Sequence, residues 1–263
     1  MAATSREDPS VSIVTAVRNG MPFVADTIAS VLAQSYRKIE YIVVDGQSTD
    51  GTLEVIRRSE SRLAKWLSEP DGGIANAFNK GLRLSTGDYL MFLNSDDWLA
   101  DRDAITRLVE AARARDWPHV IYGDCDLYDR RDGRLLYRAS IPYSRGALLR
   151  GAALPHPGLL TSRAYFARYG EFDESFRIAM DLELFLRGVP RLGADHVPVL
   201  VTNIRSGGLS TRDRRLAVEE TFRALDKNGH LRSELAKMRL RGYYFARYLA
   251  RRALESLGLR RSS

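Results

Sequence analysis

Residues Tyr89–Ala100, YLMFLNSDDWLA, join a short apolar run to two adjacent aspartates, Asp96 and Asp97. The apolar run predicts a buried strand over Asp88–Asn94, and the aspartates follow where that strand stops. Two neighbouring carboxylates repel each other, and each resists leaving water. The pair therefore requires either solvent or a cation, and which of the two it has decides what the protein does.

Strands and helices alternate regularly over the first half of the chain. β-Branched runs predict strands at Val11–Val17 and Ile39–Asp45. Helices are predicted over 23–34, 51–60, 72–85 and 103–115, with further strands at 62–69 and 119–128. This alternation predicts an α/β fold with a mostly parallel central sheet flanked by helices. Ligands of such sheets bind beyond the carboxyl ends of the strands, where Asp45, Asp96 and Asp97 lie.

The pattern is less regular after about residue 130. A hairpin turn around Asp132-Gly133, a helix over 180–188, a strand over 196–204 and a Gly-rich basic loop over 205–215 are predicted, and the rest from about Leu216 is helical. We divide the chain into a flexible N-terminus (1–9), an α/β domain (10–213, in halves 10–100 and 101–213) and a C-terminal helical basic extension (214–263).

Composition indicates a soluble globular protein. The chain has 263 residues, of which 44% are hydrophobic and 28% charged, enough for a sizeable core. The single cysteine, Cys125, excludes an internal disulfide framework and fits a reducing compartment. The polar N-terminus argues against a secretory signal, and no stretch approaches the roughly 20 apolar residues that span a bilayer. We expect a cytoplasmic location.

The positive charge is concentrated at the C-terminus. Residues 237–263 hold eight basic residues and one acid, Glu255, so this segment accounts for the whole net charge of +7. Arginines beside tyrosines and leucines suit an anionic membrane surface, which would place the protein on the inner face of the cell membrane. Packing of these apolar residues on the main domain is the alternative. Residues 1–236 have no net charge and carry no recognised nucleic-acid-binding motif, so we expect the protein not to bind nucleic acid.

Six segments in order resemble the family 2 inverting glycosyltransferases with the GT-A nucleotide-sugar fold. They are VSIVTAVRNG, IEYIVVDGQSTDGT, EPDGGIANAFNKG, GDYLMFLNSDDW, HPGLLTSRAYFARYGEFDESF and MDLELFLRG, between about Ser10 and Ser210. The later segments are similar to bacterial enzymes that build surface polysaccharides and glycolipids. The resemblance implies transfer of a sugar, with inversion, from a nucleotide-diphosphate donor, commonly a UDP-sugar, to a hydroxyl of a glycan or lipid-linked acceptor.

The resemblance implies a nucleotide site made of Thr15, Ala16, Arg18, Asp45, Asp71 and Asp96. We expect Thr15, Ala16 and Arg18 on the loop after the first strand. Asp45 would accept a hydrogen bond from the base, and its alternative role is to cap the turn into GQSTDGT. Asp71 would contact the nucleotide and, compatibly, cap the helix that follows it.

The adjacent aspartates match the D-x-D pattern of the family, with Ser95 at the first position. Carboxylate oxygens suit Mg²⁺ or Mn²⁺, which would bridge to the donor diphosphate. We expect Asp97 to be the direct metal ligand, with Asp96 directed toward the ribose or a metal-bound water. An exposed acidic turn that caps the helix near Asp103 is the alternative.

Inverting transfer requires a base that takes the proton of the acceptor hydroxyl, and the resemblance assigns this role to Asp181. Glu183 lies two residues on, about 200° around a helix, and would not share the role. A helix start lowers a carboxyl pKa, so burial must offset this effect. The alternative is an acid placed there only because it suits the helix dipole.

Two further groups are implied around the acceptor and the diphosphate. His156 would border the acceptor site, either orienting the sugar or contacting phosphate, and a structural loop histidine is its alternative. A mobile loop with Arg205, Gly207, Gly208 and Ser210 would close over the diphosphate. An ordinary surface loop is the alternative there.

Three other functions fit the sequence less well. A non-catalytic nucleotide-sugar-binding or scaffold protein on the same fold is disfavoured by the retained acids. A sugar nucleotidyltransferase would need a Gly-rich basic loop after the first strand, which TAVRNGMP matches poorly. An oxidoreductase is disfavoured because no G-x-G-x-x-G follows the first strand.

Overall fold

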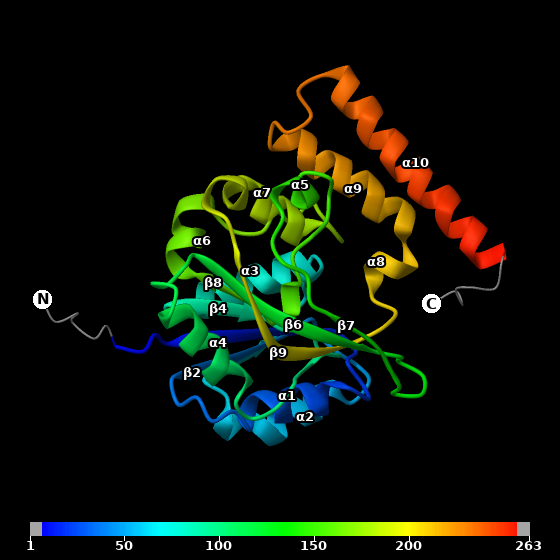
Figure 1. The fold of residues 1–263 in the computed structure, drawn as a ribbon. Helices are drawn as coiled ribbons and strands as arrows, with labels where there is room; N and C mark the ends of the chain where they lie inside the picture. The colour runs from blue at the N-terminus through cyan, green and yellow to red at the C-terminus, as the bar shows by residue number, and fades with distance from the viewer. Residues whose placement is uncertain (1–6, 257–263) are drawn as a thin grey trace, which may run out of the picture.

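A computed structural model describes residues 7–256 and shows a nine-stranded sheet between layers of helices (Figure 1). The strands are β1 Val11–Val17, β2 Ile39–Asp45, β3 Lys65–Ser68, β4 Tyr89–Phe92, β5 Trp98–Leu99, β6 Val120–Tyr128, β7 Leu135–Ala139, β8 Leu159–Ser162 and β9 Asp195–Arg205. The helices are α1 Val24–Leu32, α2 Thr52–Ser59, α3 Ile74–Leu84, α4 Ala104–Arg113, α5 Arg145–Leu148, α6 Arg163–Tyr169, α7 Met180–Leu192, α8 Leu209–Arg212, α9 Arg214–Lys227 and α10 Glu234–Ser256. The predicted α/β fold is confirmed.

The sheet runs in the order β3-β2-β1-β4-β8-β6-β9-β5, with β7 paired to β6. The strands β3, β2, β1 and β4 are parallel to one another. β8 is antiparallel to both β4 and β6, while β6 and β9 are parallel. The first half of the chain therefore forms the parallel part of the sheet, and the second half makes the sheet mixed.

Both faces of the sheet are covered, which explains why its strands read as continuous apolar runs rather than alternating ones. Every residue of β1 is buried. One core cluster packs Ile13 of β1 with residues of α1 and α4, and the other packs Val14 with residues of α3 and α7. In Figure 1, α1 and α2 lie below the sheet and α3 and α7 above it.

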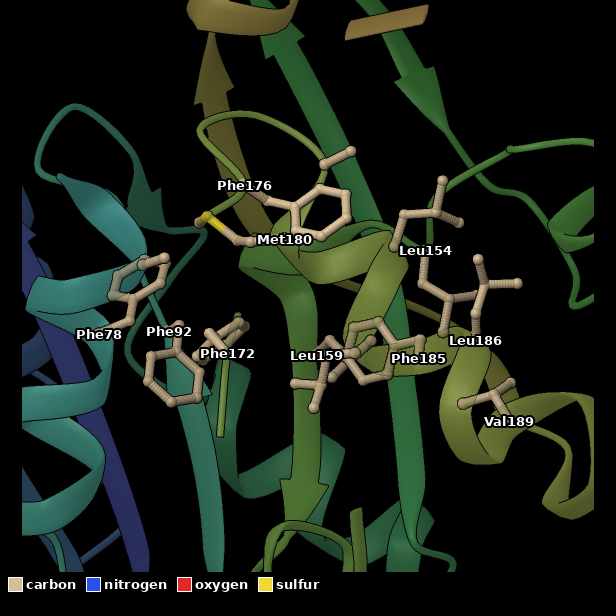
Figure 2. Packing of buried hydrophobic residues seen from close by; sticks show 14 of the residues in the cluster. Phe78, Phe92, Leu154, Leu159, Phe172, Phe176, Met180, Phe185, Leu186 and Val189 are labelled. Atoms are coloured by element: carbon tan, nitrogen blue, oxygen red, sulfur yellow. The ribbon is translucent and has the colours of Figure 1, made fainter. Parts of the chain in front are cut away.

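The upper core continues into the C-terminal helices. Ala224, Leu225, Leu231 and Leu240 are buried in the same cluster as Phe92 of β4. Figure 2 shows the middle of this cluster, where Phe176, Met180 and Phe185 lie around the start of α7. Residues from 214 onward therefore belong to the same folded unit as the sheet, at least as far as Leu240.

Two elements differ from the sequence prediction. Trp98–Leu99 forms a short strand, β5, that pairs with Asn203 and Thr202 of β9. The predicted loop 205–215 contains the helix α8, and its first residue, Arg205, belongs to β9. The strand β5 and the place of Arg205 in β9 depend on pairing with segments 77 to 105 residues away, which a local sequence pattern does not reveal. Residues 1–6 and 257–263, parts of the predicted flexible N-terminus and basic extension, lie outside the described residues.

The exposed side of α10 is apolar and basic. Met238 and Phe245 are 60% and 62% exposed, and Arg239 and Arg241 are exposed beside them. The opposite side packs on the domain through Leu240, and the Tyr244 hydroxyl donates to the Arg150 carbonyl at 3.0 Å. Among residues 7–256, no helix is both long enough and apolar enough to cross a bilayer.

Candidate active site

The carboxyl ends of β1, β2 and β4 form one rim. Val17 is paired with Asp45, and the Gly46 amide donates to the Val17 carbonyl at 2.8 Å. On the other side of β1, the Leu93 amide donates to the Val14 carbonyl at 2.9 Å. The acids that end β2 and follow β4 therefore flank the end of the same strand.

Asp45 is fully buried at this rim. It accepts hydrogen bonds from the Ser48 amide at 3.2 Å and from the Ser68 hydroxyl at 2.6 Å. The predicted alternative role, capping the turn after β2, is therefore present in the structure. Contact between Asp45 and a nucleotide base remains a prediction.

Asp71 lies against the end of β2. A Cβ atom built on Gly46 would meet Asp71 Oδ2 at 2.2 Å and the Arg18 Cβ at 3.4 Å. The other carboxylate oxygen of Asp71 accepts from the Gly73 amide at 2.9 Å, which leads into α3. Arg18, Gly46 and Asp71, far apart in sequence, therefore gather at one place, as the predicted nucleotide site requires.

Thr15 and Ala16 do not lie on the loop after the first strand, so that expectation is wrong. Both are inside β1, because the strand continues to Val17. The Thr15 side chain is fully buried and accepts a hydrogen bond from the Tyr41 hydroxyl at 3.2 Å. Of the three residues assigned to that loop, only Arg18 is exposed there.

The loop after β1 brings the aspartate pair into the same rim. A Cβ on Gly20 would lie 3.6 Å from the Ser95 Cβ, so this loop touches the segment that carries Asp96 and Asp97. Asn19 ties the loop to the segment after β2, because its amide donates to Ser48 Oγ at 2.8 Å. The three loops after β1, β2 and β4 therefore form one continuous surface.

Asp97 is 1% exposed and is held by three groups. Asn94 Nδ2 donates to its Oδ2 at 2.9 Å, the Arg205 amide donates to its Oδ1 at 3.2 Å, and Thr27 Oγ1 donates to its carbonyl at 2.7 Å. Burial and the neighbouring charge of Asp96 raise the pKa of Asp97 to about 7, against the hydrogen bonds from Asn94 and Arg205. The surroundings of Asp97 therefore disfavour its ionised form unless a cation is bound beside it.

Two arginines hold the aspartate loop, namely Arg205, which was predicted near the diphosphate, and Arg130, which was not predicted at this site. Arg130 forms an ion pair with Asp96 and lies over the Phe23 ring, 4.6 Å from its centroid. Arg205 donates to the Asp96 carbonyl at 2.6 Å, and its guanidinium lies 4.3 Å from both the Phe23 and Trp98 ring centroids. The sequence offered no signal for these contacts, since they join residues about 35 to 180 positions apart.

Arg205 is a fixed residue rather than part of a mobile loop, so this part of the prediction is wrong. It ends β9, and its guanidinium is also paired with Asp26 of α1 at 2.8 Å. The loop proper begins at Ser206, whose hydroxyl accepts from the Arg130 amide at 3.1 Å. Gly207 has φ +91°, a conformation that favours glycine, and Gly208 precedes α8. The side chain of Ser210 lies outside the described part.

The aspartate pair fits a divalent cation only if other ligands are supplied. Within residues 7–256, no group of three or more His, Cys, Asp or Glu side chains could hold a metal ion. Asp96 and Asp97 provide two carboxylates, and burial together with the charge of Asp96 raises the pKa of Asp97 although Arg205 opposes the shift. Mg²⁺ and Mn²⁺ commonly take one or two protein carboxylates together with phosphate oxygens and water, which this pair satisfies.

Asp181 is partly buried at the start of α7, where its Oδ1 accepts from the Leu182 amide at 2.7 Å. Burial raises the pKa of Asp181 to about 6 despite backbone hydrogen bonds that lower it. The offset that a base at a helix start requires is therefore present. Glu183 is fully buried and paired with Arg187 and Lys227, so it is not free to share the role.

The segment that carries Asp181 is tied to the rim through α3. Asn76 Nδ2 and Asn79 Nδ2 donate to the two carboxylate oxygens of Glu174 at 2.9 and 2.8 Å. The Gly72 amide, next to Asp71, donates to Asn76 Oδ1 at 3.2 Å. Asp71 and the approach to Asp181 are therefore connected by one short chain of contacts.

His156 packs in an aromatic cluster. Its ring centroid lies 5.5 Å from Phe78, 5.9 Å from Phe92 and 6.1 Å from Phe172. Burial lowers the pKa of His156 to about 4, so the imidazole is neutral near pH 7. This setting favours an orienting or structural role over contact with phosphate as a cation.

The fold and the rim define an α/β protein with a candidate ligand site at the carboxyl ends of its strands. Residues 12–158 match the sequence profile of Glycosyl transferase family 2, so the chain belongs to this family and is a glycosyltransferase. An uncharacterised glycosyltransferase of Mycobacterium tuberculosis is 36% identical over 181 residues, covering 68% of each chain. A PGL/p-HBAD biosynthesis glycosyltransferase of Mycobacterium bovis is 26% identical over 208 residues, covering 77% of this chain and 79% of that one.

Two solved structures share the fold. S. aureus TarS 1-349 in complex with UDP-GlcNAc has a TM-score of 0.65 at 15% identity, over 82% of this chain and 66% of that one. The mannosyltransferase PcManGT from Pyrobaculum calidifontis, in complex with GDP-Man and Mn²⁺, has a TM-score of 0.59 at 20% identity, over 82% and 65%. The chain thus spans just under two thirds of the length of each. At these identities the likeness concerns the fold alone.

Proposed function

We propose that this glycosyltransferase moves a sugar, with inversion, from a UDP-sugar to a hydroxyl of a glycan or a lipid-linked acceptor in cell-surface glycan or glycolipid synthesis. The observation that carries the proposal is the gathering of Arg18, Asp45, Asp71, Asp96 and Asp97 at one rim. The PGL/p-HBAD relative supports a glycolipid acceptor, and the UDP-GlcNAc complex of TarS supports a UDP donor.

Different residues of the chain would bind the donor and act on the acceptor. Asp45, Asp71 and Arg18 would bind the nucleoside, since carboxylates accept from an imide N–H and a guanidinium suits phosphate. Asp181 would take the proton of the acceptor hydroxyl during displacement, because its pKa of about 6 leaves it ionised and still basic near pH 7. His156, neutral and stacked, would orient the acceptor sugar.

Asp97 and Asp96 would hold Mg²⁺ or Mn²⁺, which when bound supplies positive charge to the departing nucleotide diphosphate. The Mn²⁺ in the PcManGT complex supports a metal on this fold. Gly207, Gly208 and Ser210 would close over the diphosphate, next to Arg130. The basic, partly exposed α10, with the rest of residues 237–263, would contact an anionic membrane surface that carries the acceptor.

A screen of nucleotide sugars, with and without Mn²⁺, tests the proposal. We expect one UDP-sugar to raise the melting temperature and to be slowly hydrolysed only when the metal is present. Binding without hydrolysis or transfer to any acceptor would support a non-catalytic protein instead. Protection by GDP-sugars alone would reject the uracil assignment while leaving the reaction class intact.

A further inference from the structure

The helix α9 holds the segment that leads into α7. The Glu220 carboxylate accepts hydrogen bonds from three consecutive backbone amides, those of Arg177 at 2.9 Å, Ile178 at 2.8 Å and Ala179 at 2.9 Å. Glu220 is 3% exposed, so these bonds form away from water. Hydrogen bonds to a charged group of this kind are among the stronger ones in proteins.

The local sequence provides no substitute for this carboxylate. Ala179 occupies the N-cap position of α7 and has no side chain that can accept a hydrogen bond. Amides at and before a helix start lack partners within the helix and must find them elsewhere. Glu220, 41 residues beyond Ala179, supplies the acceptor oxygens for these amides.

Two other side chains of α9 hold the same segment. Arg223 Nη2 donates to the Ser175 carbonyl at 2.7 Å, and its guanidinium lies 3.8 Å from the Phe176 ring centroid. Lys227 Nζ pairs with Asp173 at 2.6 Å and with Glu183 at 2.9 Å. Because positions 220, 223 and 227 share one helix face, α9 fixes the segment from Asp173 to Ala179 along its length.

We propose that Glu220 is a positioning residue for Asp181, which follows Ala179 by two positions. The inference rests on the proposed role of Asp181 as the base. A base must hold its oxygen within hydrogen-bond reach of the acceptor hydroxyl, and an error of about 1 Å can cost about 100-fold in rate. Glu220 fixes the backbone from which Asp181 projects, so the C-terminal region takes part in transfer without touching substrate.

The test compares Glu220→Ala and Glu220→Gln with Glu219→Ala and Glu219→Gln. Glu219 is the exposed neighbour on the same helix and provides a matched loss of charge. Four quantities are measured well below the melting temperature of each variant: kcat, nucleotide affinity, the pH dependence of kcat, and hydrogen exchange at the amides of residues 177–179. Glu220→Gln keeps the size of the side chain and one acceptor oxygen, so it serves if Glu220→Ala does not fold.

We expect kcat to fall about 100-fold in Glu220→Ala and about tenfold in Glu220→Gln, with nucleotide affinity within about twofold of wild type. The pH midpoint of kcat should move, and exchange at the amides of residues 177–179 should accelerate. The Glu219 variants should match wild type. The inference is overturned if Glu220→Gln speeds amide exchange but leaves kcat and the pH midpoint unchanged, or if kcat and nucleotide affinity fall together. Failure of the proposed function has another signature, namely full activity in Asp181→Asn.

Discussion

A carboxylate oxygen of Asp71 lies over the Cα of Gly46, so close that a Cβ on Gly46 would sit 2.2 Å from it. The residue after β2 therefore has to be glycine for Asp71 to reach the end of that strand. This contact brings together two of the loops that form the proposed nucleotide site.

Gly46→Ala should weaken nucleotide binding while the protein still folds. The added methyl group displaces Asp71, and an overpacked contact of this kind costs about 1–3 kcal/mol. Isothermal titration with the nucleotide should show a loss of affinity of about five- to 150-fold. Gly242→Ala, which meets nothing within 4 Å, is the control and should bind as wild type does. Equal affinities for the two variants would remove Asp71 from the nucleotide site.

Asp181→Asn should abolish transfer and leave nucleotide affinity unchanged. In the wild-type protein, a base with a pKa of about 6 is ionised above that pH and protonated below it. The rate should therefore fall about tenfold for each pH unit below about 6 and level off above it. A profile of kcat against pH at saturating donor measures this. Full activity of Asp181→Asn would show that another group takes the proton.

Asp97→Asn should stabilise the metal-free protein at alkaline pH. The pKa of Asp97 in the folded protein, about 7, lies above its ordinary value of 3.8, because of burial first and of Asp96 second. The contribution of Asp97 to stability is therefore complete below pH 3.8, declines as the pH rises from that value, and is fully lost above about pH 7. The loss is about 4 kcal/mol, and Asp97→Asn avoids it.

Melting temperatures of wild type and Asp97→Asn, measured in the presence of a chelator at about pH 4.5 and about pH 8, test whether the variant is the more stable protein at alkaline pH. The gap between variant and wild type should be small at the lower pH and several times larger at the higher pH, and Glu219→Gln, which removes an exposed acid, should show none. Mn²⁺ should stabilise wild type more at the higher pH, because a carboxylate ligand must lose its proton, and should not stabilise Asp97→Asn. Similar stabilisation of both proteins would place the metal elsewhere.

Met238→Ser with Phe245→Ser should reduce binding to anionic liposomes. Both side chains are exposed on α10, whereas Leu240 on its other side is buried, so the double variant changes the surface and spares the core. Loss of this apolar surface should weaken binding by about tenfold. Tyr137→Ser, 59% exposed on β7, is the control. Sedimentation with liposomes that is the same for all three proteins would exclude contact through this side of α10.

The sequence predicted the parallel half of the fold and the acids at its rim, because β1, β2 and β4 are local apolar runs with a polar residue at the end or within two positions of it. Val11–Val17 and Ile39–Asp45 were predicted with the bounds that the structure has. The contacts around Asp97 could not be predicted, since Arg130 and Arg205 arrive through long-range pairing. The same holds for Glu220, which is one of three acids on α9 and is not distinguished from the others until α9 is packed against α7.

The position of β8 between β4 and β6 has a consequence for how the molecule forms during synthesis. The parallel strands β1 to β4 emerge from the ribosome first and can pair at once, but β6 cannot join them until Leu159–Ser162 has been made. Arg205 follows later still, and its amide completes the bonds to Asp97. The nascent chain thus carries an unfinished aspartate loop while the 108 residues from Asp97 to Arg205 are added.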